Sequence, residues 1–162
     1  MNTWTRLVIA SLLLVVTCQG QSFTKETPIA ESSVPKTVLQ TFKSAYPTAK
    51  IRGCRRVEID GTTFYKIETR EGASHRYFSY SPSGELKKTE DVIAADDLPA
   101  GAQQSIHEKY ADAPITFAAK ITQGDQIAYR VNVKSHDKMF KLELDAEGKI
   151  TAAREVKLTL VY

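Results

Sequence analysis

The sequence predicts an α+β protein built from two tandem α-β-β-β-β repeats, with an antiparallel sheet of up to eight strands and helices on one face. Three observations support this fold class. The chain of 162 residues matches itself without a gap when Val34 is placed on Leu98. Each copy begins with helical periodicity and continues with alternating strands, and turn residues separate the expected strands.

The two copies, 34–92 and 98–162, preserve both a turn glycine and the apolar phase of several strands. Val34-Pro35 aligns with Leu98-Pro99, and Gly84 aligns with Gly148. The aligned apolar pairs are Tyr46 with Tyr110, Ile51 with Ile115, Tyr65 with Tyr129, Ile67 with Val131, Phe78 with Leu142, and Tyr80 with Leu144. Chance similarity rarely preserves both features, so the repeat is the strongest signal in the chain.

A helix is expected at the start of each copy. Pro35 and Pro99 suit a first helical turn, where the missing N–H costs nothing. The apolar residues that follow at helical spacing are Val38, Leu39, Phe42 and Tyr46 in the first copy, and Ala102, Ile106 and Tyr110 in the second. Pro47 ends the first helix.

Four strands are expected after each helix. In the second copy one side of the strands is assigned to Ile115, Phe117, Ala119, Ile121, Tyr129, Val131, Val133, Phe140, Leu142 and Leu144, and Ile150 begins the fourth strand. Asp60-Gly61 and Gly124-Asp125 indicate hairpins between the first two strands of each copy. The apolar sheet face needs a cover, and the helix of each unit is the cover available.

A single unit of about 60 residues would be marginally stable. We therefore expect the two repeats to share one core. The alternative is two separate beads, but the linker 93–97 is too short to isolate them.

Residues 1–20 are typical of a signal peptide. Arg6 provides the positive charge, and the uncharged run from Leu7 to Val16 is too short to span a bilayer of ~30 Å. Residues 21–33 are polar and without periodicity, which predicts a flexible tether. The expected localisation is the periplasm or the exterior.

Two processing routes remain open. Cleavage after Gly20 would leave Gln21 first, whereas Val15-Val16-Thr17-Cys18 resembles a lipoprotein box, with Cys18 as the lipidated residue. Thr17 departs from the small residue usual before that cysteine. Once the signal is removed, Cys54 and Cys18 cannot form an internal disulfide in the mature chain, so the fold depends on its apolar core.

Little in the sequence indicates catalysis, a metal or a cofactor. His75, His107 and His136 form no metal-ligand pair at helical spacing. Alternation places Cys54 on the same face as His75, but a strand lies between them, which disfavours a nucleophilic pair. A net charge of +3 is too weak for a nucleic-acid footprint.

The sheet face away from the helices is the candidate binding surface. Alternation assigns to the core side Ile51, Val57, Ile59, Tyr65, Ile67, Phe78 and Tyr80, and to the open side Lys50, Arg52, Cys54, Arg56, Phe64, Lys66, His75 and Tyr77. Open-side positions in the second copy are Thr116, Ala118, Lys120, Ala128, Arg130, Met139 and Lys141. The candidate partner-binding residues are Arg52, Arg56, Phe64, Lys66, His75 and Tyr77, because arginine and aromatic residues are enriched at interface hot spots.

The first repeat has a net charge of +4, whereas the net charge of residues 98–156 is zero. We therefore expect an acidic partner. The competing interpretation of the same face is a solvated surface whose charges discourage aggregation.

The chain resembles the PepSY-like family of bacterial envelope proteins, which is similar to β-lactamase-inhibitor protein. The resemblance rests on Val34-Pro35, the run from Tyr46 to Ile51, Tyr65-Lys66-Ile67 and Ser83-Gly84, and on their second-copy equivalents Leu98-Pro99, Tyr110-Ala111, Ile115, Tyr129-Arg130-Val131 and Glu147-Gly148. It implies a curved sheet with helices on the convex side and a concave face that grips a partner enzyme. No residue here matches an inhibitory loop, and a fold does not fix function.

The sequence thus favours a non-catalytic exported module that binds a protein or peptide through the open sheet face, as inhibitor or sensor. The alternative is a small-molecule or ion-binding envelope protein that uses the groove between the repeats. An enzyme is the third and weakest hypothesis.

Overall fold

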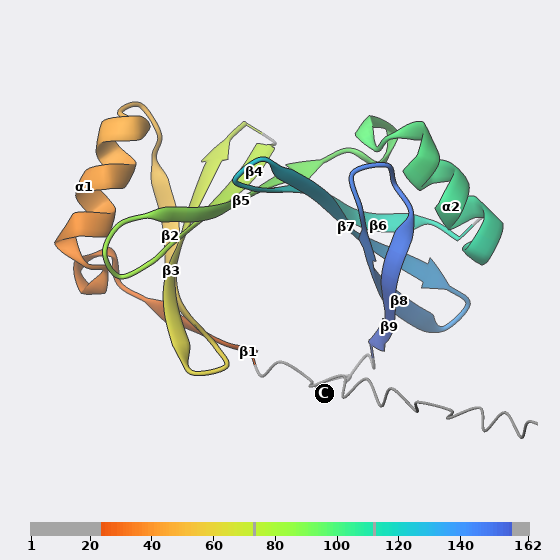
Figure 1. Cartoon of the computed structure of the whole chain (residues 1–162), viewed down its shortest axis with the longest axis horizontal. Coiled ribbons are helices and arrows are strands. Elements are labelled where there is room, and N and C mark those ends of the chain that lie inside the picture. The colour runs from red at the N-terminus through yellow and green to blue at the C-terminus, as the bar shows by residue number, and fades with distance from the viewer. Residues whose placement is uncertain (1–23, 73, 112, 157–162) are drawn as a thin grey trace, which may run out of the picture.

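The computed structural model describes residues 24–72, 74–111 and 113–156. Nine strands form one antiparallel sheet in the order β1 to β9, and its outer side carries two α-helices (Figure 1). The strands are β1 Thr24–Ile29, β2 Ile51–Ile59, β3 Thr62–Glu71, β4 Ser74–Tyr80, β5 Leu86–Ile93, β6 Ile115–Gln123, β7 Gln126–Ser135, β8 Lys138–Leu144 and β9 Ile150–Val156. The helices are α1 Lys36–Ala45 and α2 Ala100–Tyr110, with short 3₁₀ turns at Glu31–Ser33 and Ala95–Asp97.

The predicted fold class is confirmed. The first copy contains α1 and β2 to β5, and the second contains α2 and β6 to β9. Strand β5 pairs with β6 over residues 89–93, which joins the two copies into one continuous sheet. The sheet is bent into an arch with α1 and α2 on its convex side (Figure 1).

The predicted flexible tether is wrong for most of its length. Residues 24–29 form the edge strand β1, which pairs with β2 from Thr24 opposite Ile59 to Ile29 opposite Cys54. Ile29 packs against the first-repeat core, and Glu31–Ser33 follow as a 3₁₀ turn. Pairing at the sheet edge satisfies the backbone hydrogen bonds of this segment, and it does not require apolar residues at alternate positions. The sequence pattern therefore did not reveal this ninth strand. The predicted signal peptide and Cys18 lie outside the described residues.

The expected single core is also wrong, because the buried apolar residues form two clusters. The first contains Val34, Val38, Phe42, Cys54, Ile67, Phe78 and Tyr80, and the second contains Leu98, Ala102, Ile106, Ala118, Val131, Val133, Leu142 and Leu144. Each helix covers the strands of its own copy. The copies are therefore connected through the sheet and retain separate cores.

Both helices begin directly after the prolines of the repeat motif, and both pack against a turn of their own copy. Thr37 Oγ1 donates to the carbonyl of Pro82 at 3.1 Å, in the turn that contains Gly84. In the second copy Gly148 lies so close to the helix that a Cβ built on it would be 2.2 Å from the backbone nitrogen of Ala102. Both glycines have a φ near +89°, which other residues rarely adopt.

A β-bulge near the start of β2 reverses the face assignment of that strand. Ile51 pairs with Thr69, but Gly53 pairs with Glu68, so β2 contains one more residue than β3 here. The predicted placement of Cys54 and Arg56 on the open side is therefore wrong, as is the predicted placement of Val57 and Ile59 on the core side. A matching shift between Ile115 and Phe117 reverses β6, moving Ala118 and Lys120 to the helix side and Phe117, Ala119 and Ile121 to the open side.

The buried phenol of Tyr80 is expected to make the protein less stable at alkaline pH. Burial, with Tyr46 nearby, raises the pKa of Tyr80 from 10 to about 12, and the residue is 1% exposed. The phenol ionises in the unfolded chain first, so its contribution is complete below pH 10 and is lost as the pH rises toward 12. We expect the free energy of unfolding to fall by about 2–3 kcal/mol over this range. Urea titrations at several pH values should show a shallower loss for Tyr80→Phe; an equal loss would contradict the assignment.

Candidate functional site

The sheet face opposite the helices, here called the open face, is the concave side of the arch. Directly paired residues of an antiparallel sheet lie on the same face, so the strand register identifies its members. Its basic residues are Arg55, Lys66, Arg70, Lys88, Arg130, Lys134, Lys141 and Arg154, and its acidic residues are Glu26, Glu68, Glu90 and Glu143. Among the described strands, eight cations thus face four carboxylates.

Four of the six predicted binding residues lie on this face: Phe64, Lys66, His75 and Tyr77. His75 Nδ1 lies 3.3 Å from Glu68 Oε1, on the neighbouring strand. The remaining two do not join them. Arg56 pairs with Tyr65 in the register and lies on the helix side, 3.4 Å from Glu58. Arg52 is the extra residue of the bulge and lines a groove on the helix side.

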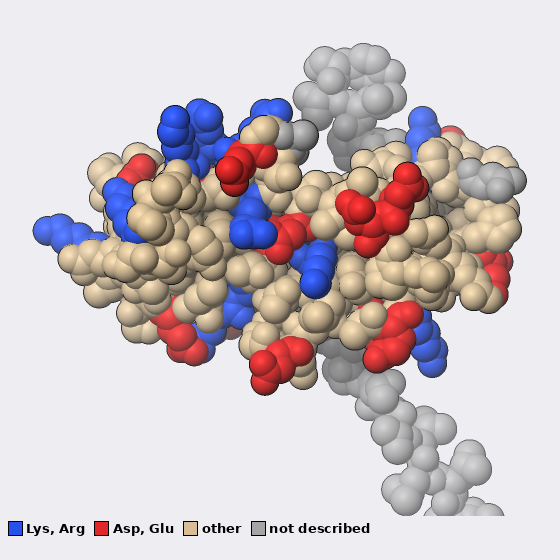
Figure 2. Space-filling view, turned by 90° about the horizontal axis from the view of Figure 1, so that it is seen from above, with Lys and Arg blue, Asp and Glu red and all other residues tan. Residues whose placement is uncertain are grey.

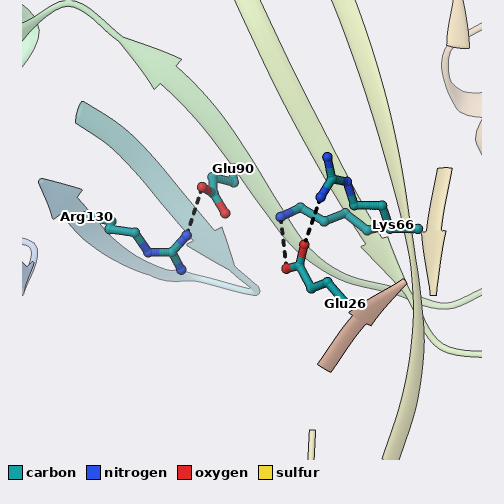
Figure 3. A network of polar contacts seen from close by, with 5 residues as sticks. Glu26, Lys66, Glu90 and Arg130 are labelled. Carbon is teal, nitrogen blue, oxygen red and sulfur yellow. Dashed lines mark hydrogen bonds and ion pairs between the residues drawn. The ribbon is translucent and has the colours of Figure 1, made fainter. Parts of the chain in front are cut away.

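A charged and aromatic cluster occupies the first-repeat half of the open face. Glu26, on β1, lies 3.6 Å from Arg55 and 3.5 Å from Lys66 (Figure 3). The Lys66 ammonium also lies 4.7 Å from the ring centroid of Tyr77, within cation–π range. Burial, followed by the nearby Glu68 and Glu90 carboxylates, raises the pKa of Tyr77, so the phenol stays protonated at neutral pH.

An ion pair crosses from one repeat to the other at the centre of the arch. Arg130 Nη1, on β7, donates to Glu90 Oε1, on β5, at 2.9 Å (Figure 3). The Glu90 side chain is 5% exposed and that of Arg130 is 31% exposed. Within the described part of the chain, Glu90 Oε2 is buried and has no hydrogen-bond partner. Glu90 therefore retains an acceptor that neighbouring protein groups do not satisfy.

Lys88 is a half-buried cation of the open face. It lies opposite Ser79, in the same row of the sheet as Lys66 and Arg55. Burial and then the Arg130 charge lower the pKa of Lys88, and Glu90 opposes them. No ion pair joins its ammonium to any described carboxylate. Lys88 therefore forms a half-enclosed positive site beside the Glu90–Arg130 pair.

Sequence reasoning identified Arg130 on the open face but missed Glu26, Arg55, Lys88 and Glu90. Glu26 was missed because its strand lies in the predicted tether. Arg55 was missed because unbroken alternation was applied through Gly53. A glycine inside a strand pattern is a recognised sign of a bulge, so Gly53 was the available signal.

The geometry gives no support to a thiol–imidazole pair. Cys54 lies in the helix-side core, where burial raises the pKa of its thiol, whereas His75 lies on the open face. Within the described ranges, His, Cys, Asp and Glu side chains form no group that could hold a metal ion. None of the helices described is long and apolar enough to cross a membrane.

The fold and the face together define the class: a tandem-repeat α+β protein with one curved sheet, helices on the convex side and a charged concave face. The family whose model matches is described as "Putative beta-lactamase-inhibitor-like, PepSY-like", over residues 21–88 and 78–152. The chain belongs to this family, as its motifs predicted. The family is described by likeness to an inhibitor and not by an enzymatic activity. No curated protein gives a significant match.

Solved structures from Bacteroides share the fold. A DUF2874 family protein from B. uniformis is 16% identical, with a TM-score of 0.66 over 77% of this chain and 91% of the other. A "putative periplasmic" protein from B. eggerthii is 14% identical, with a TM-score of 0.65 over 76% and 89%. A BLIP-like protein from B. fragilis is 15% identical, with a TM-score of 0.60 over 79% and 92%.

Proposed function

We propose that this protein is a non-catalytic module of the bacterial envelope that binds an acidic protein or peptide surface on its open face. The observation that carries the proposal is the excess of cations over carboxylates on a concave surface that extends across both repeats. A concave face with an excess of one charge sign steers oppositely charged partners toward it.

The cluster around Tyr77 has the composition of an interface hot spot. Tyr77 offers a large planar surface, and the Lys66 ammonium lies over its ring. Arg55 and Lys66 both approach the carboxylate of Glu26. Glu26 lies within ion-pair distance of both cations and restricts their side chains, so that less conformational entropy is lost when a partner binds. Tyrosine and arginine at a preorganised, partly desolvated site are typical anchors of protein recognition.

Lys88 specifies the chemistry expected of the partner. Lys88 is half-buried, and the two nearby carboxylates already pair with other cations: Glu26 with Lys66, and Glu90 with Arg130. A carboxylate brought by the partner would neutralise Lys88 and offset its desolvation. The centre of the open face is therefore best suited to an Asp or Glu side chain.

The envelope location rests on the predicted export signal and on family resemblance to proteins described as periplasmic. Lipidation at Cys18 is part of the proposal as the means of tethering the module to a membrane. Palmitate labelling of the full chain, compared with Cys18→Ser, would test it: loss of label supports tethering, and an unlabelled wild type contradicts it.

The binding proposal is tested with two matched variants, each of which combines several substitutions. The open-face variant combines Arg55→Ser, Lys66→Ser and Tyr77→Ser. The helix-side control combines Lys25→Ser and Arg56→Ser, which also remove exposed cations, from β1 and β2. Each protein, shown to be folded by circular dichroism, is used to retrieve partners from envelope extract. A retrieved protein is then purified, and its affinity is measured at low and high salt.

We expect the control to bind as the wild type does and the open-face variant to lose affinity at least about tenfold, because several charged contacts are removed. The wild-type affinity should fall with salt, since opposite charges are screened. Equal affinity for all three proteins, failure of the wild type to retrieve a partner, or insensitivity to salt would each overturn the proposal.

A further inference from the structure

A groove of about 1120 Å³ opens on the helix side of the sheet, beside the junction of the two repeats. Its walls come from the end of α1 and the segment 45–50, the β3–β4 hairpin, and the segment 91–97 that leads into the second repeat. Tyr46 and Phe78 lie at its apolar side, with ring centroids 4.5 Å apart. The volume exceeds that of a single ion and suits an organic molecule.

Basic side chains from three segments converge on this groove. They are Lys50, Arg52 and Arg76; Arg70 and His75, which belong to the open face, border the groove at the end of the β3–β4 hairpin. Figure 2, which views the helix side, shows lysine and arginine side chains gathered along one edge of the first-repeat half. The bulge that moves Arg52 away from the open face is the feature that brings it here.

The acidic residues of the groove neutralise only part of this charge. Glu71, Asp91 and Asp97 line the groove: Asp91 pairs with Arg76, the Asp97 carboxylate accepts from the Ala94 N–H at 3.3 Å, and no ion pair joins Glu71 to a described cation. Lys50 and Arg52, in contrast, form no ion pair or side-chain hydrogen bond with the part of the chain that is described. The groove thus has two available cations beside an aromatic wall.

The second repeat serves as an internal comparison. The positions equivalent to Lys50, Arg52 and Arg76 in the self-alignment hold Pro114, Thr116 and Phe140. Phe140 packs against Tyr110, with ring centroids 5.2 Å apart, where the first repeat has Arg76 near Tyr46. The second copy has therefore filled this space with an aromatic ring. The cations occur in the copy whose groove is bounded by 91–97, the segment that leads into the other repeat.

We infer that this groove binds an organic anion, a molecule with a carboxylate or phosphate on an apolar or aromatic body. The anion would lie between Lys50 and Arg52, whose guanidinium suits bidentate recognition of such groups. The apolar body would contact Tyr46. This inference goes beyond the proposed function, because Lys50, Arg52 and Arg76 are not residues of the open face.

The test uses three probes that share a ring and differ in charge: phenyl phosphate, phenylacetate and neutral phenylacetamide. Each is titrated into ¹⁵N-labelled protein and followed by amide chemical shifts. We expect saturable shifts in residues 45–52 and 91–94 with at least one anion, and binding of phenylacetamide at least about tenfold weaker. Response to phenyl phosphate alone or to phenylacetate alone identifies the anionic group.

Arg52→Ser should lower the affinity for the anion about tenfold. Arg56→Ser, a change in the same strand but outside the groove, should leave this affinity unchanged. Arg76→Phe, which copies the second repeat, should also remove binding while the protein stays folded. Absence of saturable shifts, equal affinity for phenylacetamide, equal effects of Arg52→Ser and Arg56→Ser, or shifts confined to the open face would each overturn the inference. None of these outcomes depends on the open-face partner.

Discussion

Replacing Gly148 by alanine is expected to destabilise the protein by about 3–5 kcal/mol. A loss of this size needs a specific structural cause, which here is steric. Gly148 has a φ of +88°, which strains any residue with a Cβ. The added Cβ would lie 2.2 Å from the Ala102 nitrogen and 2.6 Å from its Cα. These are backbone atoms of α2, so a side-chain rotation cannot relieve the clash and the helix itself must move.

The first repeat supplies the matched control. Gly84, the equivalent of Gly148, has a φ of +89°, but its added Cβ would lie 3.1 Å from the nearest atoms, the Thr37 carbonyl oxygen and Thr41 Oγ1. Gly84→Ala should therefore cost mainly the backbone strain, about 1–2 kcal/mol. Urea denaturation of both variants measures the difference. Similar losses in the two variants would contradict the close packing of the 145–148 turn on α2.

Phe42→Ala is expected to destabilise the first repeat by about 3–5 kcal/mol, the usual cost of removing a buried phenylalanine side chain. Phe42 is 0% exposed, and its ring centroid lies 5.3 Å from that of Phe78 and 5.5 Å from that of Tyr46. The loss combines the transfer of the ring to water with the cavity left beneath α1.

Because the two repeats have separate cores, we expect the destabilisation by Phe42→Ala to be confined mainly to the first repeat. Because the second cluster does not include Phe42, hydrogen exchange should accelerate in α1 and in β2 to β4 while the centres of β7 and β8 keep most of their protection. Ile106→Ala, in α2, should produce the reverse pattern. Uniform acceleration over both repeats in either variant would show that the two copies unfold as one unit.

Separate cores also bear on function, because the two proposed sites depend on the junction between the repeats in different ways. The Glu90–Arg130 pair connects β5 with β7 across the open face, and the groove is bounded on one side by 91–97. The Arg52→Ser and open-face variants allow each site to be measured alone.

The sequence by itself determined the repeat and the fold class. The gapless self-alignment places Gly84 on Gly148 and Pro35 on Pro99, and these positions fix the turns and helix starts of both copies. Such features are local: a turn needs a glycine at positive φ, and a helix needs a periodic apolar stripe. Strands β3 and β4, which have no bulge before Lys66 and Tyr77, were assigned to the right faces for the same reason.

Only the tertiary structure decided the composition of the candidate site. The bulges of β2 and β6 insert one residue against the partner strand, and alternation cannot show an insertion that depends on the register of two strands. This insertion moves Arg52 and Arg56 to the helix side and brings Arg55 to the open face. Strand β1 depends on pairing with β2 and not on any periodicity of its own, so Glu26 joins the site only once the chain is folded. Pairing partners are chosen by contacts between distant segments, and these exist only in the three-dimensional fold.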